Sequence, residues 1–177
     1  KTPCSAGRAP SADFKPQLWS MGICEVLLPL TDSPSIEVQG NSAAALGNLS
    51  SKADDYAPFN AVWDKPAGGL HGYLVRFLES EDTTFQHIAV WTLIQLLESG
   101  NHELEQHIRD SPHLLDLVRQ LQSRIGTFES EHEQADTSTA ADTSGQDVSP
   151  EREIAALSRR IEEILFEESD DGTSDAK

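Results

Sequence analysis

The stretch Ser-Ile-Glu-Val-Gln-Gly-Asn-Ser-Ala-Ala-Ala-Leu-Gly-Asn-Leu-Ser-Ser, residues 35–51, decides the fold. Its apolar and small residues recur at steps of three and four, which is the spacing of one face of an α-helix. Because burying a leucine stabilises a fold by roughly 1.5–3 kcal/mol, we expect Leu46 and Leu49 to face a core. The predicted buried face contains Val38, Ser42, Ala45, Leu46 and Leu49, and the predicted exposed face contains Glu37, Asn41, Ala44 and Asn48.

The same pattern returns 47 positions later, where Gln39 falls on Gln86 and Leu46 on Leu93. An internal period of this length is typical of helical repeat proteins, in which each unit buries its apolar face against the next. We predict units of three helices, the third unit ending after its second helix. The predicted first helices are 14–20, 56–63 and 103–109, the second helices are 23–31, 70–78 and 114–121, and the long third helices are 36–50 and 84–98.

The fold class predicted from this period is all-α, an α-solenoid of about two and a half repeats over residues 13–122. Gly47 lies inside a predicted helix, where glycine costs about 1 kcal/mol relative to alanine. Its presence there suggests that a neighbouring helix approaches closely. The glycine-rich break at 65–69 lacks the spacing and the lysine of a phosphate-binding loop, so we interpret it as a turn.

The composition changes after the repeats. Residues 123–149 are rich in Ser, Thr, Asp, Glu, Gly and Gln, so we predict a disordered acidic linker. Residues 150–168 are predicted to form an amphipathic helix that docks on the uncovered end of the repeat stack, or alternatively in a partner's groove. Its apolar face is Ile154, Leu157, Ile161, Ile164 and Leu165. We expect residues 1–12 to be an irregular N-terminal segment and residues 169–177 to be an acidic tail.

The charge of the chain limits its partners. The 177 residues carry a formal charge of -17, and 15 acidic but only 5 basic side chains follow Gln122. Such a balance argues against nucleic acid and against an anionic membrane surface as direct partners. The two cysteines, Cys4 and Cys24, are too few for a disulfide framework and favour a reduced, intracellular setting.

No catalytic constellation is found in the sequence. It contains no nucleophile motif and no cofactor fingerprint. The six histidines are scattered, and His102 and His107 are five residues apart, which places them off a common helical line. No spacing of Cys, His and Asp matches a zinc site. We therefore expect a protein that is not an enzyme and has no cofactor and no metal.

The three-helix unit with Glu-Val-Gln-Gly-Asn-Ser-Ala-Ala-Ala-Leu-Gly-Asn-Leu-Ser, residues 37–50, resembles the armadillo repeat. Residues 35–51, 66–77 and 84–99 are similar to the C-terminal repeats of the vacuolar armadillo-repeat proteins of fungi. The resemblance implies an adaptor that binds peptide segments of partner proteins on the cytosolic face of the vacuole membrane. The implied partners are myosin-receptor proteins of vacuole inheritance, nuclear-envelope proteins of nucleus–vacuole junctions, proteins of autophagy and cytoplasm-to-vacuole targeting, and the machinery of vacuole fusion.

The family's membrane anchor is a lipidated N-terminus. That segment is not found in this chain. The resemblance therefore leads us to expect that membrane attachment needs a lipidated N-terminus outside this sequence. This stretch by itself is then expected to be cytosolic.

The resemblance also implies which residues would hold a peptide. Armadillo proteins place an asparagine late in the third helix, where its amide can pair with a peptide backbone, and often a tryptophan one turn earlier. Asn48 and Gln95 match the asparagine position and Trp91 the tryptophan position, while Asn41 and Ile88 lie one turn further back. Alternatively, these are surface or inter-repeat packing residues. A nuclear-import cargo receptor, the other armadillo function considered, would carry tryptophan and asparagine in the same unit, and neither unit does.

Overall fold

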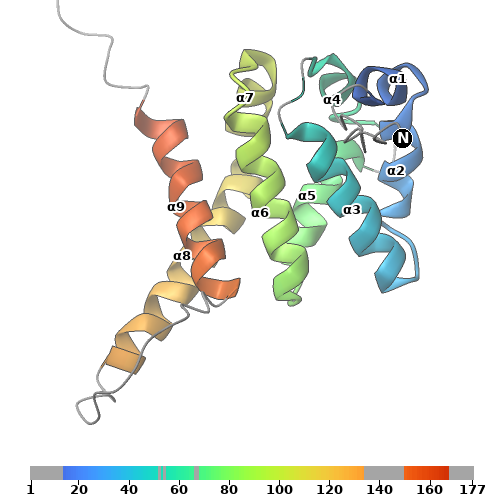
Figure 1. Cartoon of the computed structure of the whole chain (residues 1–177). Coiled ribbons are helices and arrows are strands. Elements are labelled where there is room, and N and C mark those ends of the chain that lie inside the picture. The colour runs from blue at the N-terminus through green and yellow to red at the C-terminus, as the bar shows by residue number, and fades with distance from the viewer. Residues whose placement is uncertain (1–13, 52, 54, 66–67, 134–149, 168–177) are drawn as a thin grey trace, which may run out of the picture.

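The computed structural model describes residues 14–51, 53, 55–65, 68–133 and 150–167 (Figure 1). Regular structure in these residues is entirely helical, with no strand. None of the described helices has the length and apolar character needed to cross a membrane. The helices are α1 (Lys15–Ser20), α2 (Ile23–Leu30), α3 (Ile36–Ser50), α4 (Ala57–Ala61), α5 (Gly69–Glu79), α6 (Thr83–Leu97), α7 (His102–Arg109), α8 (Pro112–Glu133) and α9 (Pro150–Glu167).

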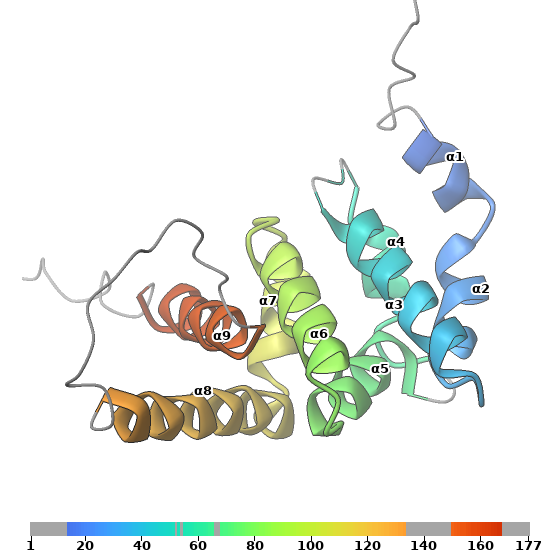
Figure 2. The ribbon, with the colours of Figure 1, turned by 60° about the horizontal axis from the view of Figure 1, so that its bottom comes forward.

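The helices form successive units that stack along the chain. Helices α1–α3 make the first unit, α4–α6 the second, and α7 and α8 begin the third (Figures 1 and 2). The second helices pack in series, α2 on α5 and α5 on α8, and the third helix α3 packs on α6. The predicted all-α solenoid is confirmed, and apart from α8 the helix ends lie within two residues of the predicted ones.

Local sequence explains where several helices begin. The Asp82 carboxylate accepts hydrogen bonds from the backbone N–H groups of Thr84 (2.8 Å) and Phe85 (3.2 Å), which caps α6. At the first residue of α5, Gly69 has φ +54°, and a Cβ atom there would lie 2.3 Å from the carbonyl oxygen of Val62. Only glycine fits at this position. Of the glycine-rich break, Gly68 and Gly69 make the tight entry into α5, and the N–H of Gly68 donates to the carbonyl oxygen of Lys65 at 3.0 Å.

The core lies between the units. Leu46, Leu93 and Leu96 are fully buried, as the repeat predicts. The prediction is wrong for Val38, which is 37% exposed. Its equivalent in the second unit, Phe85, is half-buried and stacks on the ring of Phe77. Within the described chain, α3 has a third-helix neighbour only on its α6 side, so the side that carries Val38 is left uncovered.

Helix α8 corrects the predicted linker. It runs to Glu133, so residues 123–133 are helical rather than disordered as predicted. In the sequence, the apolar spacing of Leu114, Val118 and Leu121 continues through Ile125. Adding residues to a helix that already exists costs far less than starting a new one, which allows α8 to continue past 122. The rest of the predicted linker, 134–149, and the segments 1–12 and 169–177 lie outside the described residues.

Helix α9 packs against both α6 and α8, so it docks on the end of the repeat stack as predicted. Ile154, Ile161 and Leu165 are buried, while Leu157 and Ile164 are half-buried. Its neighbours show a further relation. Helix α6 packs on α5 of its own unit and on α3 of the preceding unit, and α9 packs on α8 and α6 in the same way. The third unit therefore has a third helix, which the sequence prediction did not assign to it.

Candidate functional site

The residues predicted to bind a peptide lie on the two adjacent helices α3 and α6. Asn41 and Asn48 are exposed on α3, whereas Ile88, Trp91 and Gln95 are half-buried on α6. Ile88 also packs against the hydrophobic core, whereas the other four do not belong to the core. We refer to these five residues as the third-helix surface.

Trp91 lies at the junction of the two helices. A Cβ atom added to Gly47 would lie 2.7 Å from Cζ3 of Trp91 and 2.8 Å from Oγ1 of Thr92, closer than Cβ atoms approach their neighbours. The absence of a side chain at Gly47 thus allows the indole to lie against the α3 backbone, beside Asn48. This close approach confirms the interpretation of Gly47. It also gives Trp91 a packing role, while part of its ring remains accessible.

The side-chain amides of Asn41, Asn48 and Gln95 make no hydrogen bond within the described part of the chain. Each amide offers both a donor and an acceptor, which is the combination that pairs with a peptide backbone. The third-helix surface therefore presents unused amide groups on α3 and on α6, the helix that carries Trp91. It carries no catalytic group.

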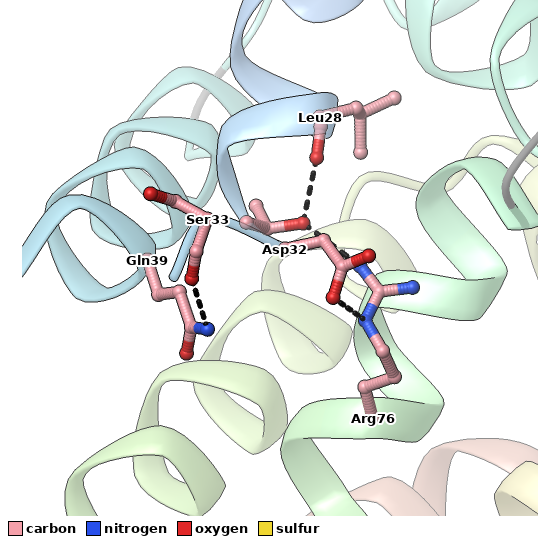
Figure 3. A network of polar contacts seen from close by, with 6 residues as sticks. Leu28, Asp32, Ser33, Gln39 and Arg76 are labelled. Atoms are coloured by element: carbon pink, nitrogen blue, oxygen red, sulfur yellow. Dashed lines mark hydrogen bonds and ion pairs between the residues drawn. The ribbon is translucent and has the colours of Figure 1, made fainter. Parts of the chain in front are cut away.

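Two other glutamines, which the sequence did not mark as special, use their amide N–H groups within the fold. The Nε2 atom of Gln39 donates to the carbonyl oxygen of Ser33 at 2.6 Å, and Gln86 donates in the same way to Ser80. Both bonds hold the turn before the third helix, and Figure 3 shows the one made by Gln39. Gln39 and Gln86 are related by the 47-residue period, so their repetition was the available signal for this role.

Thr92 is a second residue whose role the sequence did not reveal. It is fully buried beneath the junction of α3 and α6, and its hydroxyl donates to the carbonyl oxygen of Ile88 at 2.8 Å. The Tyr73 hydroxyl lies 3.4 Å from the same Thr92 oxygen. Burial raises the pKa of Tyr73 above its ordinary value, so this phenol stays neutral. These contacts fix the turn of α6 that carries Trp91.

A cavity of about 290 Å³ lies away from the third-helix surface, between α2 and α5. Leu28, Pro29 and Gly69 line it together with two ion pairs, Glu25–Lys65 at 3.1 Å and Asp32–Arg76 at 3.7 Å. The Arg76 guanidinium also donates to the Thr31 hydroxyl at 3.1 Å, which ties the second unit to the turn after α2 (Figure 3). These interactions brace the two units against each other.

Two titratable groups near this cavity have shifted pKa values. Burial raises the pKa of the Cys24 thiol to about 12, so it remains protonated and is a poor nucleophile at neutral pH. Hydrogen bonds from its own backbone N–H and from Lys65 lower the pKa of Glu25. In the described part of the chain, no group of three or more His, Cys, Asp or Glu side chains could hold a metal ion.

Comparison with known proteins agrees with this architecture. Residues 11–51 match the family model of the Armadillo/beta-catenin-like repeat. The chain is 59% identical over 123 residues to vacuolar protein 8 of Schizosaccharomyces pombe, covering 70% of this chain and 22% of that protein. It is 48% identical over 155 residues to vacuolar protein 8 of Gibberella zeae, covering 88% and 25% of the two chains.

Similarity extends over most of the chain in a further relative. Vacuolar protein 8 of Yarrowia lipolytica is 43% identical over 165 residues, which cover 93% of this chain and 27% of the relative. The chain thus spans about a quarter of the length of these relatives. With its stacked three-helix units and these similarities, the chain contains armadillo repeats and is homologous to vacuolar protein 8 over most of its own length.

Proposed function

We propose that this chain is part of a non-enzymatic adaptor and that its third-helix surface binds an extended peptide of a partner protein. The observation that carries the proposal is the pair of unused amides, Asn48 and Gln95, on adjacent helices beside the accessible part of Trp91. In an extended peptide, the N–H and C=O groups of every second residue point to the same side. The amides of Asn48 and Gln95 can pair with such groups. The indole offers an apolar face on which a peptide side chain can pack.

The place of action that we propose is the vacuole membrane, on its cytosolic face. The support is the similarity to proteins named vacuolar protein 8, of which this chain spans about a quarter. The proposed partners are proteins of vacuole inheritance, nucleus–vacuole junctions, autophagy and vacuole fusion. A nuclear-import receptor is less well supported, because α3 combines Asn48 with Ala44 and α6 combines Trp91 with Gln95.

A random peptide library tests the proposal without requiring that the sequence of the partner be known. The library is displayed on phage and selected on the immobilised chain, and the affinity of each selected peptide is then measured by fluorescence anisotropy. We expect Asn48→Ala to weaken binding about fivefold, since a hydrogen bond contributes about 1 kcal/mol. Asn48→Ala/Gln95→Ala should weaken it further. Because Asn48 is exposed, its loss leaves the thermal midpoint unchanged.

The matched control is Gln120→Ala, which removes an exposed amide from α8. This variant should bind the selected peptides as the parent does. Trp91→Ala should reduce binding more than Asn48→Ala, but it also leaves space over Gly47, so its circular dichroism spectrum is compared with that of the parent. If peptides bind the Asn48→Ala/Gln95→Ala variant as tightly as the parent, the proposed surface is wrong.

A further inference from the structure

Helix α9 extends the third-helix surface by one helix. It relates to α6 as α6 relates to α3, because each packs on the preceding third helix and on the second helix of its own unit. Neighbouring helices lie about 8–10 Å apart and an extended peptide advances about 3.3 Å per residue. About six residues therefore suffice to reach from α3 across α6 to α9.

The contacts of α9 define its faces. Its buried face carries Ile154, Ser158 and Ile161. The side toward α8 is marked by Glu162, whose carboxylate lies 3.5 Å from Arg119. On the side toward α6, the Glu153 carboxylate lies 3.3 Å from Nε2 of His87, and Arg160 forms an ion pair with Glu98 at 3.5 Å. Opposite the buried face, where α3 and α6 carry the third-helix surface, α9 presents the exposed residues Arg152, Ala156, Arg159, Arg160 and Glu163.

Two guanidinium groups on α9 are available to a ligand. Arg159 is exposed and makes no hydrogen bond or ion pair within the described residues. Arg160 is paired with Glu98 at 3.5 Å and with Glu163 at 3.4 Å, but its side chain is 49% exposed and both carboxylates are about equally exposed. Exposed pairs at such distances are weak, so an incoming carboxylate can replace them.

The outer face of α9 differs in charge from the other third helices, because it carries Arg152, Arg159 and Arg160 against one glutamate, Glu163. The corresponding residues of the third-helix surface on α3 and α6, exposed or half-buried, carry no positive charge; they are Asn41, Asn48, Ile88, Trp91 and Gln95. The chain as a whole carries a formal charge of -17. An acidic peptide residue is thus repelled over most of the molecule and attracted at Arg159 and Arg160, where a guanidinium can bind a carboxylate through two hydrogen bonds.

We propose that α9 forms the third part of the peptide-binding surface and that Arg159 and Arg160 select a peptide with an acidic residue at the end that lies over α9. The inference rests on the proposed peptide binding. It adds the chemistry of the ligand: a neutral segment over α3 and α6, followed by Asp or Glu over α9. The acidic residue also fixes the direction in which the peptide lies.

Charge reversal tests this selection with the same phage-displayed random library. Peptides selected on the parent chain should carry Asp or Glu on one side of a neutral segment. Arg159→Glu/Arg160→Glu should select Lys or Arg at that position instead. For a peptide selected on the parent, the neutral variant Arg159→Gln/Arg160→Gln should lose about fivefold in affinity for each carboxylate pair removed. Lys65→Glu, which reverses an exposed charge paired with Glu25 on α2, is the control and should select the same peptides as the parent.

Each outcome separates this inference from the proposed function. The role of α9 alone is overturned if the selected peptides lose affinity with Asn48→Ala/Gln95→Ala but show no preference for an acidic residue. It is also overturned if both arginine variants keep that preference. Failure to select any peptide overturns the proposed function itself. Flotation with vesicles of phosphatidylcholine and phosphatidylserine tests the anionic membrane: binding that is lost in the Arg159→Gln/Arg160→Gln variant would overturn the peptide assignment. Circular dichroism and amide exchange of α9 verify that it remains docked in the neutral variant.

Discussion

The contact of α3 with α6 and the contact of α6 with α9 join third helices by different means. Between α3 and α6, glycine allows close contact because it has no side chain. Gly47 leaves room for Trp91 and Thr92, and Gly40 faces Phe85. Between α6 and α9, the Arg160–Glu98 ion pair at the edge accompanies a buried apolar face that includes Ile161.

The difference shows that third helices can pack in the same way although the chain segments that connect them differ in length. Helices α3 and α6 belong to units in which three helices follow one another closely, whereas 16 residues separate the end of α8 from the start of α9. The first contact depends on a close approach at one point. The second depends on buried apolar area. The entropic cost of bringing α9 to α6 grows only slowly with the length of the connection, and the burial of apolar area can offset it. Substitutions at each contact can therefore tell the two apart.

The largest effect is expected from Ile161→Ala on α9. Ile161 is fully buried, and truncating a buried isoleucine costs about 2–5 kcal/mol through lost burial and the cavity left behind. Urea unfolding and amide exchange of α9 measure the loss. Phe166→Ala is the control, since Phe166 is 53% exposed and its removal should cost much less. Equal losses for the two variants would contradict the docking of α9 through its apolar face.

Gly47→Val should break the contact of α3 with α6. Its Cβ atom alone would overlap Trp91 and Thr92, and overpacking of this kind costs about 1–3 kcal/mol. The free energy of unfolding is measured in urea. Gly40→Ala is the matched control on the same helix: its Cβ atom would lie 3.5 Å from Phe85, an ordinary contact, and alanine favours a helix by about 1 kcal/mol. A stabilising Gly47→Val would show that the helices are not in close contact there.

The two glutamines that hold the turns should differ in importance. Gln86 is buried, so Gln86→Leu leaves the Ser80 carbonyl without its partner and should cost about 1–3 kcal/mol. Gln39 is half-buried, and water can replace its bond to Ser33. Gln39→Leu should therefore cost less in the same urea titration. The reverse order would mean that the first unit, not the second, carries the stability of the stack.

The smallest effect is expected from Arg160→Gln. The pair with Glu98 is about half-exposed, and such pairs contribute about 0–1 kcal/mol. Unfolding in urea at low and high salt should show a small difference at low salt that shrinks as salt is added. A large loss that persists at high salt would show that ion pairs, rather than apolar burial, hold α9 in place.

Much of the fold was predictable because it is repeated in the sequence. The period that relates Leu46 to Leu93 predicted the units, and apolar spacing predicted the buried face of α9. The prediction for 123–133 was wrong because composition does not show that a helix already formed can continue. Gln39 and Gln86 matched each other across the period, but only the structure showed what their amides bind.

The candidate site was less predictable than the fold. The exposure of Asn41 and Asn48 followed from helical spacing, whereas the position of Trp91 against Gly47 depends on how α3 and α6 meet. The sequence by itself determined the helices, their apolar faces and their repetition, since these depend on neighbouring residues. Only the tertiary structure decided that α9 completes the third unit and brings Arg160 beside Glu98, because that contact joins residues distant in the chain through burial of apolar area.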